Sequence, residues 1–357
     1  MAAEPFRDRY EPLLARSPEV AAARVLRLPA QVPPWTDTGI EVASGEEISL
    51  LAAGRIVLSE ALDLSAGPRL YLWGRIGPRG AIFNPTGDTT TIRAEESGRL
   101  YLGIYAGEWA NRQGDLATPL EAYAALGGGI DVAAIRWRGP AAHGLAALHA
   151  AAPADPLLAA ECARLAAPVE APSGWEYHWL LGRADVFQRA RVDGRSAIAL
   201  RAVDDVGILR RAIEVPLAED TILRWSWRVA RLPSERAEDA LPSHDYLSIA
   251  LEFDDGKDLT WYWSAALPPE TAFACPLPHW NARETHLVVR SGRAGLGRWQ
   301  REERRVLADQ QRAIGGRAPA RIAAVWLIAV SLFGHGVAEA AFADIELACA
   351  GARVRVE

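Results

Sequence analysis

The side chains best suited to proton transfer gather between residues 244 and 290 of this sequence. Histidine, tyrosine and carboxylate groups most often act as acids and bases in enzymes, because their pKa values can be tuned towards neutrality. Successive side chains of a strand point to opposite faces, so alternate residues share a face. Alternation along the expected strands of this segment places six such residues on one polar face: His244, Tyr246, Glu252, Tyr262, His286 and Arg290.

Two interpretations of this polar face stay open. If the strands are neighbours and the face is concave, the six residues form a catalytic site. If the face is the outer surface of an antiparallel sheet, the same residues are simply solvated. The first interpretation predicts a lyase, hydratase, isomerase or glycoside-acting hydrolase without an organic cofactor. A hydrolase would place two carboxylates across a cleft.

The thirteen tryptophans provide a second signal. Indole rings stack on sugar rings or flat apolar ligands and donate a hydrogen bond through their N–H. Pairs of tryptophan at a spacing of two can equally face a core. Trp109 lies in an insertion and is the best candidate for an exposed ring in the first half of the chain. The candidate ligand-binding residues are Trp109, Trp225, Trp227, Trp261, Trp263 and Trp299.

Composition excludes several classes of partner. A net charge of −6 and a pI near 5.8 argue against nucleic acid or an anionic membrane, since both need positive countercharge. No apolar run is long enough to span a membrane, and the N-terminus has no signal-like apolar stretch. Cys162, Cys275 and Cys349 lack metal-ligand spacing, so each is expected to be a small buried hydrophobe and no metal site is predicted. These features predict a cytoplasmic protein with a small-molecule partner, in an oligomeric state left open.

Cofactor chemistry is restricted by the same composition. Lys257 is the only lysine, and it lies in an expected hairpin turn where a Schiff base is not favoured. The glycines from Gly292 to Gly297 do not have the dinucleotide-binding spacing. No organic cofactor is therefore predicted. Asp254, Asp255 and Asp258 are candidates for a weak surface cation.

The sequence pattern predicts that the elements which position these residues are mostly β-strands. A chain of 357 residues exceeds one hydrophobic core, so two domains are expected. Residues 1–34 are expected to form a helical arm, and residues 35–137 contain short strands separated by turns, typical of a β-sandwich. Residues 138–174 are alanine-rich and predict a helical linker, which could instead pack on either domain. Strands return over 175–357 and predict a second β-sandwich.

The first sandwich resembles the galactose-binding-like fold of the PA-IL type of bacterial lectin. The residues that carry the resemblance are Trp35–Ile40, Gly45–Glu46, Gly74–Gly77, Ser97–Leu102 and Gly128–Val132. In that family a calcium ion held by an Asp…Thr…Asn-Asn loop binds the sugar. The matching positions here offer glycine carbonyls in place of the Asn-Asn pair, so calcium is the one cofactor that this resemblance leaves open.

The second sandwich is similar to the uncharacterised bacterial family DUF3047. The resemblance is carried by Leu223–Val229, Leu259–Ser264, Val288–Gly292 and Phe342–Ile345. The paired aspartate that the family often shows is here His244-Asp245. No family activity comes with the resemblance, so it implies a fold and not a reaction.

Three functional hypotheses follow from the sequence. The leading one is binding of a small carbohydrate-like or aromatic molecule on the second domain or at the domain junction, which predicts a shallow groove with exposed tryptophan. The second is the cofactor-independent enzyme, which predicts a closed pocket where histidine, tyrosine and carboxylate converge. The third is a structural or assembly module, which predicts a large exposed apolar patch.

Overall fold

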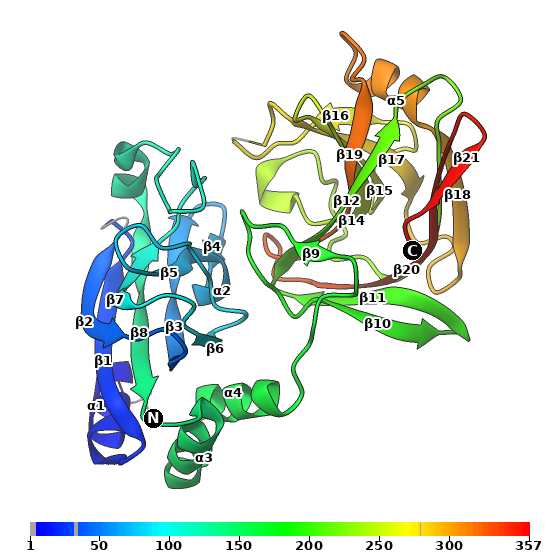
Figure 1. Ribbon diagram of the computed structural model, residues 1–357. Coiled ribbons are helices and arrows are strands. Elements are labelled where there is room, and N and C mark those ends of the chain that lie inside the picture. The colour runs from blue at the N-terminus through cyan, green and yellow to red at the C-terminus, as the bar shows by residue number, and fades with distance from the viewer. Residues whose placement is uncertain (1–4, 32–34, 279) are drawn as a thin grey trace. The chain divides into compact units, whose positions relative to one another are not determined.

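The computed structural model describes residues 5–31, 35–278 and 280–357, and it divides into two compact units (Figure 1). Unit 1 is Met1–Val169 and unit 2 is Glu170–Glu357. Both are built mostly from antiparallel strands, which confirms the mainly β fold class. Among the described residues, no helix has the length and apolar character needed to cross a membrane.

Unit 1 combines two sheets with flanking helices. One sheet has the strand order β1-β8-β3-β4 with β6 added to β3, and the other has the order β2-β7-β5. The elements are α1 (Phe6–Arg16), β1 (Val20–Pro29), β2 (Thr36–Val42), β3 (Glu47–Ser59), β4 (Leu64–Ala66), α2 (Pro68–Tyr71), β5 (Leu72–Ile76), β6 (Thr89–Arg93), β7 (Gly98–Ile104), η1 (Leu120–Ala125), β8 (Gly127–Trp137), α3 (Ala141–Ala151) and α4 (Pro156–Ala166).

The expected helical arm over residues 1–34 is only half correct. Its first piece is α1, but its second piece is the strand β1, which pairs antiparallel with β8 from Val20 opposite Trp137 to Pro29 opposite Gly129. The alanine, arginine and leucine residues of this segment favour a helix by local propensity. Pairing with β8 completes the edge of a sheet and overrides that weak preference.

The alanine-rich segment does form helices, and they pack on unit 1. Leu145 and Leu148 of α3 and Leu158 of α4 join a core with Tyr10 of α1 and Trp137 of β8. The helices therefore cover the sheet of β1, β8 and β3, as the alternative interpretation of this segment allowed.

Unit 2 is a β-sandwich of two larger sheets. One has the order β10-β11-β20-β13-β18 with β21 added to β20, and the other has the order β16-β17-β15-β14-β19-β12-β9. The elements are β9 (Glu176–Tyr177), β10 (Phe187–Val192), β11 (Arg195–Val203), β12 (Val206–Pro216), β13 (Ile222–Arg231), η2 (Leu241–Ser243), β14 (Leu247–Phe253), β15 (Asp258–Ser264), β16 (Ala272–Ala274), β17 (Glu284–Ser291), β18 (Gln300–Arg305), α5 (Val306–Ala313), β19 (Arg321–Val330), β20 (Val337–Cys349) and β21 (Ala352–Arg355).

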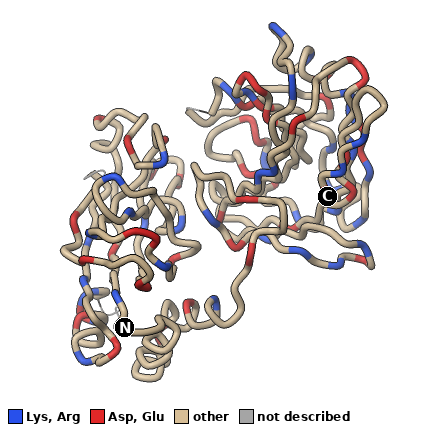
Figure 2. Tube along the Cα trace, in the orientation of Figure 1, with Lys and Arg blue, Asp and Glu red and all other residues tan. Residues whose placement is uncertain are grey.

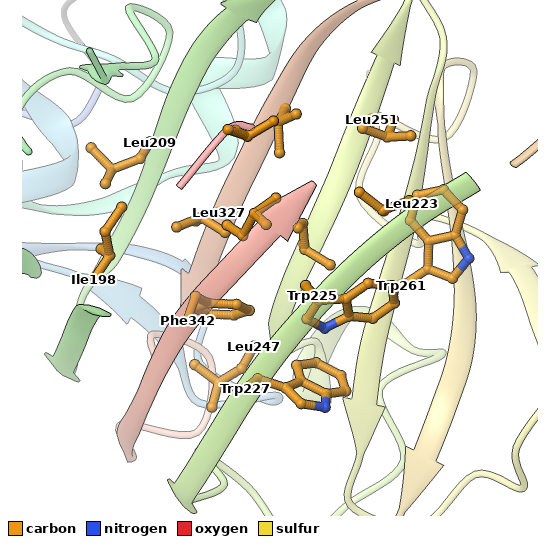
Figure 3. Packing of buried hydrophobic residues seen from close by; sticks show 14 of the residues in the cluster. Ile198, Leu209, Leu223, Trp225, Trp227, Leu247, Leu251, Trp261, Leu327 and Phe342 are labelled. Atoms are coloured by element: carbon orange, nitrogen blue, oxygen red, sulfur yellow. The ribbon is translucent and has the colours of Figure 1, made fainter. Parts of the chain in front are cut away.

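The core of unit 2 lies between these two sheets. Strand alternation places Leu247 and Leu251 of β14 on its inner face, as the sequence predicted, together with Trp225 and Trp227 of β13. Figure 3 shows these residues packed with Trp261 among aliphatic side chains. The opposite face of β14 and β15 therefore points away from this core, and the polar residues of the predicted site lie there.

Candidate functional site

Four of the six predicted acid–base residues converge in unit 2. The rings of His244, Tyr246 and His286 lie with their centroids 4.8 Å apart in every pair, and Tyr262 lies 5.6 Å from His286. All four side chains are buried. The polar face of the sheet is therefore an interior layer and not a solvated surface, which excludes the second interpretation for these four residues.

Glu252 and Arg290 lie outside this group. Glu252 forms an ion pair with Arg210, with 2.8 Å between Oε2 and Nε, and accepts a hydrogen bond from the indole of Trp326 at 3.0 Å. Arg290 follows a register shift in the β15–β17 pairing, which moves it onto the face of Trp263; its guanidinium carbon lies 5.6 Å from that ring. An extra residue in one strand reverses the alternation, and the sequence pattern cannot show this.

Three acidic or thiol side chains that the sequence interpretation missed complete the group. Asp258 and Glu284 begin β15 and β17, one residue before the expected strands, and alternation then places them on the polar face. Cys275 follows the edge strand β16, and its backbone N–H donates to the carbonyl of Glu284 at 2.9 Å. We call His244, Tyr246, Asp258, Thr260, Cys275, Glu284 and His286 the buried polar cluster.

Hydrogen bonds fix most members of this cluster. The Tyr246 hydroxyl donates to Glu284 Oε1 at 3.0 Å, and the Thr260 hydroxyl donates to Asp258 Oδ1 at 3.2 Å. His244 Nδ1 lies 2.6 Å from the carbonyl oxygen of Glu238. The Glu238 carboxylate in turn accepts hydrogen bonds from Ser264 and Tyr262, so the loop that precedes β14 is tied to the end of β15.

Burial shifts the ionisation of these groups strongly. It raises the pKa of Asp258 well above its usual value, and the nearby Glu284 carboxylate raises it further. Burial also lowers the pKa of His244 to about 3, aided by His286, and it raises the pKa of the Cys275 thiol. Burial therefore favours the neutral forms of the Asp258 carboxyl, the His244 imidazole and the Cys275 thiol.

The cluster is buried and lies away from the described surface grooves. Its two histidines and Thr260 have no measurable exposure, and none of its members lines either of the two grooves described on the surface of unit 2. A general acid or base has to reach a proton on a bound substrate. The arrangement thus lacks the open pocket that the enzyme hypothesis needs at this position.

Most of the predicted ligand-binding tryptophans are also core residues. Trp225, Trp227, Trp261 and Trp263 are fully buried between the sheets of unit 2, so none of them forms a ligand platform. Trp109 was expected to be exposed, but it is 3% exposed and lies among Trp35, Trp73 and Tyr105. These rings are buried in the core and not exposed to a ligand, because burial of an indole removes a large apolar area from water.

Trp299 differs from the others because it lines an open groove on unit 2. This groove, which we call the outer-sheet groove, has a volume of about 620 Å³ and lies on the face of β11, β13, β18, β20 and β21 that points away from the core. Its lining residues are Arg195, Arg224, Ser226, Trp299, Gln300, Arg301, Glu303, Asp344, Glu346 and Arg353.

Arginines and carboxylates alternate across the outer-sheet groove. Arg195 pairs with Asp344 at 3.0 Å, and Arg224 pairs with Glu303 at 2.7 Å and with Glu346 at 3.3 Å. Figure 2 shows positive and negative residues interleaved along the strands near the C-terminus. The groove therefore presents fixed donors and acceptors side by side.

Trp299 forms the apolar part of the groove. It is half-buried against Ala197, Ala341 and Ala343, and the guanidinium carbon of Arg195 lies 4.7 Å from its ring centroid. Its indole nitrogen has no hydrogen-bond partner among the described residues. The small alanine side chains let the ring lie close to the sheet, and the Arg195 guanidinium lies over the ring.

Comparisons with known proteins give a match to a family model within unit 2 and no activity. Residues 173–346 match the family model described as "Protein of unknown function (DUF3047)", which confirms the resemblance seen in the sequence. No curated protein matches the chain.

Two solved structures are similar to parts of the chain. One is an "EclA N-terminal domain; PllA-like lectin", with 20% identity and a TM-score of 0.25, covering 32% of this chain and 95% of that one. The other is a xyloglucanase domain of NopAA from Sinorhizobium fredii in complex with cellobiose, with 10% identity and a TM-score of 0.31, covering 50% of this chain and 95% of that one. Likenesses at these TM-scores say nothing about the ligand or the activity of this protein.

Proposed function

We propose that unit 2 binds a small polyhydroxylated, carbohydrate-like molecule in the outer-sheet groove. The observation that carries the proposal is the combination of one half-buried indole with alternating arginine and carboxylate groups in an open groove of about 620 Å³. That volume falls within the range of about 300–1,000 Å³ for small-molecule sites.

The chemistry of the groove favours a sugar over a flat aromatic ligand. An indole face binds the C–H face of a sugar ring, while neighbouring charged groups exchange hydrogen bonds with its hydroxyls. Ser226 donates to Asp344 at 3.0 Å, and this carboxylate also pairs with Arg195, so the polar groups are already held in place. A purely aromatic ligand would leave this ring of donors and acceptors without partners, which is costly.

The charge of the lining adds a preference among sugars. Arg195, Arg224, Arg301 and Arg353 face three carboxylates, and no ion pair of Arg301 is found among the described residues. This excess of positive charge favours a sugar acid over an amino sugar.

The test is to titrate the full chain with cellobiose, galactose and galacturonic acid. Binding is measured by isothermal titration calorimetry and by NMR spectra of the protein. We expect at least one saccharide to bind, and Trp299→Ala to weaken its binding at least about tenfold. Trp280→Ala is the matched control, because Trp280 is also half-buried with a guanidinium, that of Arg283, over its ring at 4.1 Å, but lies outside the groove.

Two results would overturn the proposal. One is the absence of binding for all three saccharides at millimolar concentration. The other is a Trp299→Ala protein that remains folded and binds with unchanged affinity.

A further inference from the structure

The buried polar cluster contains four donor atoms of the kinds that bind transition metals. They belong to His244, Cys275, Glu284 and His286, and no two of them are more than 4.8 Å apart. His244 Nε2 lies 3.4 Å from Cys275 Sγ, and His286 Nε2 lies 3.5 Å from Glu284 Oε1. Ligands at about 2.0–2.3 Å from a tetrahedral zinc ion are about 3.3–3.8 Å from one another. Two edges of the tetrahedron therefore already have the required length.

The tautomer of His244 suits metal binding. Its Nδ1 lies 2.6 Å from the carbonyl oxygen of Glu238, which can only accept a hydrogen bond. Nδ1 therefore carries the proton, and the lone pair of Nε2 points at Cys275. A ring N–H donated to a backbone carbonyl is the usual support of a metal-binding histidine.

His286 provides a second, independent observation. Its side chain is fully buried, and among the described residues Nδ1 has no hydrogen-bond partner, while the polar contact of Nε2 is the 3.5 Å approach to Glu284 Oε1, too poorly aligned to count as a hydrogen bond. Leaving a buried polar group without a partner costs about 1–3 kcal/mol, so proteins rarely keep one without a reason. An ion between His286 and the other three donors would supply a partner for one of these two nitrogens.

We propose that His244, Cys275, Glu284 and His286 bind one divalent transition-metal ion of the zinc class. Two imidazole nitrogens, one sulfur and one carboxylate oxygen form a donor set that zinc accepts in tetrahedral geometry, whereas calcium and magnesium prefer oxygen donors only. The Cys275 thiol releases its proton to solvent when the metal–sulfur bond forms. The thiolate and the Glu284 carboxylate then balance the two positive charges of the ion, and the site is neutral.

This site is structural in character. All four positions of the tetrahedron come from the protein, so none is left for a water or a substrate. The ion would join the loop before β14, through His244, and the edge segment after β16, through Cys275, to strand β17. Such an ion would hold these segments to the sheet and so stabilise the fold of this part of unit 2. The site lies on the sheet opposite the outer-sheet groove, so the two proposals are independent.

The first test measures the metal in the full chain, purified without chelator under reducing conditions. Elemental analysis is expected to give one zinc per chain. After removal of the metal, one equivalent of Co²⁺ should give the visible bands of a tetrahedral site and a thiolate-to-cobalt charge-transfer band. A folded protein that contains no zinc and takes up neither Zn²⁺ nor Co²⁺ overturns the proposal.

The second test assigns the ligands with matched variants. Cys275→Ser should abolish the charge-transfer band, and His286→Gln should lower zinc affinity at least about tenfold, the usual effect of damage to a metal site. Cys349→Ser is the control, because Cys349 is also a buried free cysteine of unit 2 but lies outside the cluster. A charge-transfer band that survives Cys275→Ser, or that is lost in Cys349→Ser, contradicts the assignment.

Discussion

Asp155 joins the start of α4 to α1 in unit 1, and its replacement by alanine is the best-defined stability test of this fold. Its carboxylate caps α4 by accepting hydrogen bonds from the backbone N–H groups of Leu157 and Leu158, each at 3.0 Å. It also accepts a hydrogen bond from the buried Tyr10 hydroxyl at 2.9 Å and pairs with Arg9 at 3.1 Å. Asp155→Ala therefore removes a helix cap and the acceptor of a buried hydroxyl together.

The size of the loss follows from these contacts. Loss of an N-cap side chain costs about 1 kcal/mol. The Tyr10 hydroxyl is left buried without its acceptor, which costs about 1–3 kcal/mol. Arg9 is partly exposed and adds about 0–1 kcal/mol. Together these effects destabilise unit 1 by about 2–5 kcal/mol.

The same carboxylate gives a pH dependence of known sign. Burial opposes its charged form, but hydrogen bonds from Leu158 N–H and Tyr10 and the charge of Arg9 outweigh burial and lower the pKa of Asp155 below its ordinary value. Its ionised form therefore stabilises the folded state at pH values above the unfolded-state pKa of about 3.9. This contribution is lost as the pH falls through the lower folded-state pKa. Asp155→Asn should remove the pH dependence while keeping part of the cap.

Urea unfolding followed by circular dichroism and tryptophan fluorescence measures these effects. The transition of unit 1 should move and that of unit 2 should not, so each molecule contains its own control. A Tyr10→Phe variant and the double variant complete a cycle, with an expected coupling of about 1 kcal/mol. The reasoning fails if Asp155→Ala changes the unfolding free energy of unit 1 by less than about 0.5 kcal/mol.

Two further stability predictions concern close packing. Trp227 is fully buried, and its ring centroid lies 5.6 Å from that of Trp263 and 6.1 Å from that of Phe342. Trp227→Ala should therefore destabilise unit 2 by about 3–5 kcal/mol in denaturant unfolding. A loss below about 1 kcal/mol would contradict this packing. Gly54 has φ +112°, and a Cβ there would lie 2.3 Å from the Gly129 carbonyl oxygen, so Gly54→Ala should cost unit 1 at least about 1–3 kcal/mol. Gly139→Ala, where a Cβ meets nothing within 4 Å, is its control and should leave the midpoint nearly unchanged.

The sequence by itself determined the fold class and the inner faces of the main strands. A period of two requires only that one face of a sheet is buried, so Leu247 and Leu251 could be placed in the core without any tertiary information. The same rule put Tyr262 and His286 on the polar faces of their strands, and the structure brings them together with His244 and Tyr246, which lie just before β14.

Tertiary structure decided the ends and the neighbours of these strands. Asp258 and Glu284 join the cluster because β15 and β17 each start one residue before the strand expected from the sequence. Cys275 joins it because it follows an edge strand that places it beside Glu284. Arg290 leaves the cluster because of a register shift in the pairing of β15 with β17. Such features depend on pairing between residues far apart in the chain, and local patterns carry no information about them.

The distinction between a core and a surface was likewise settled only in three dimensions. Alternation gives two faces but does not say what covers the second one. Loops cover the face that contains His286, while the corresponding face of the other sheet stays open around Trp299. The sequence thus determined which side chains share a face, and the packing of distant segments decided whether that face is dry or accessible, because burial depends on what the rest of the chain places against it.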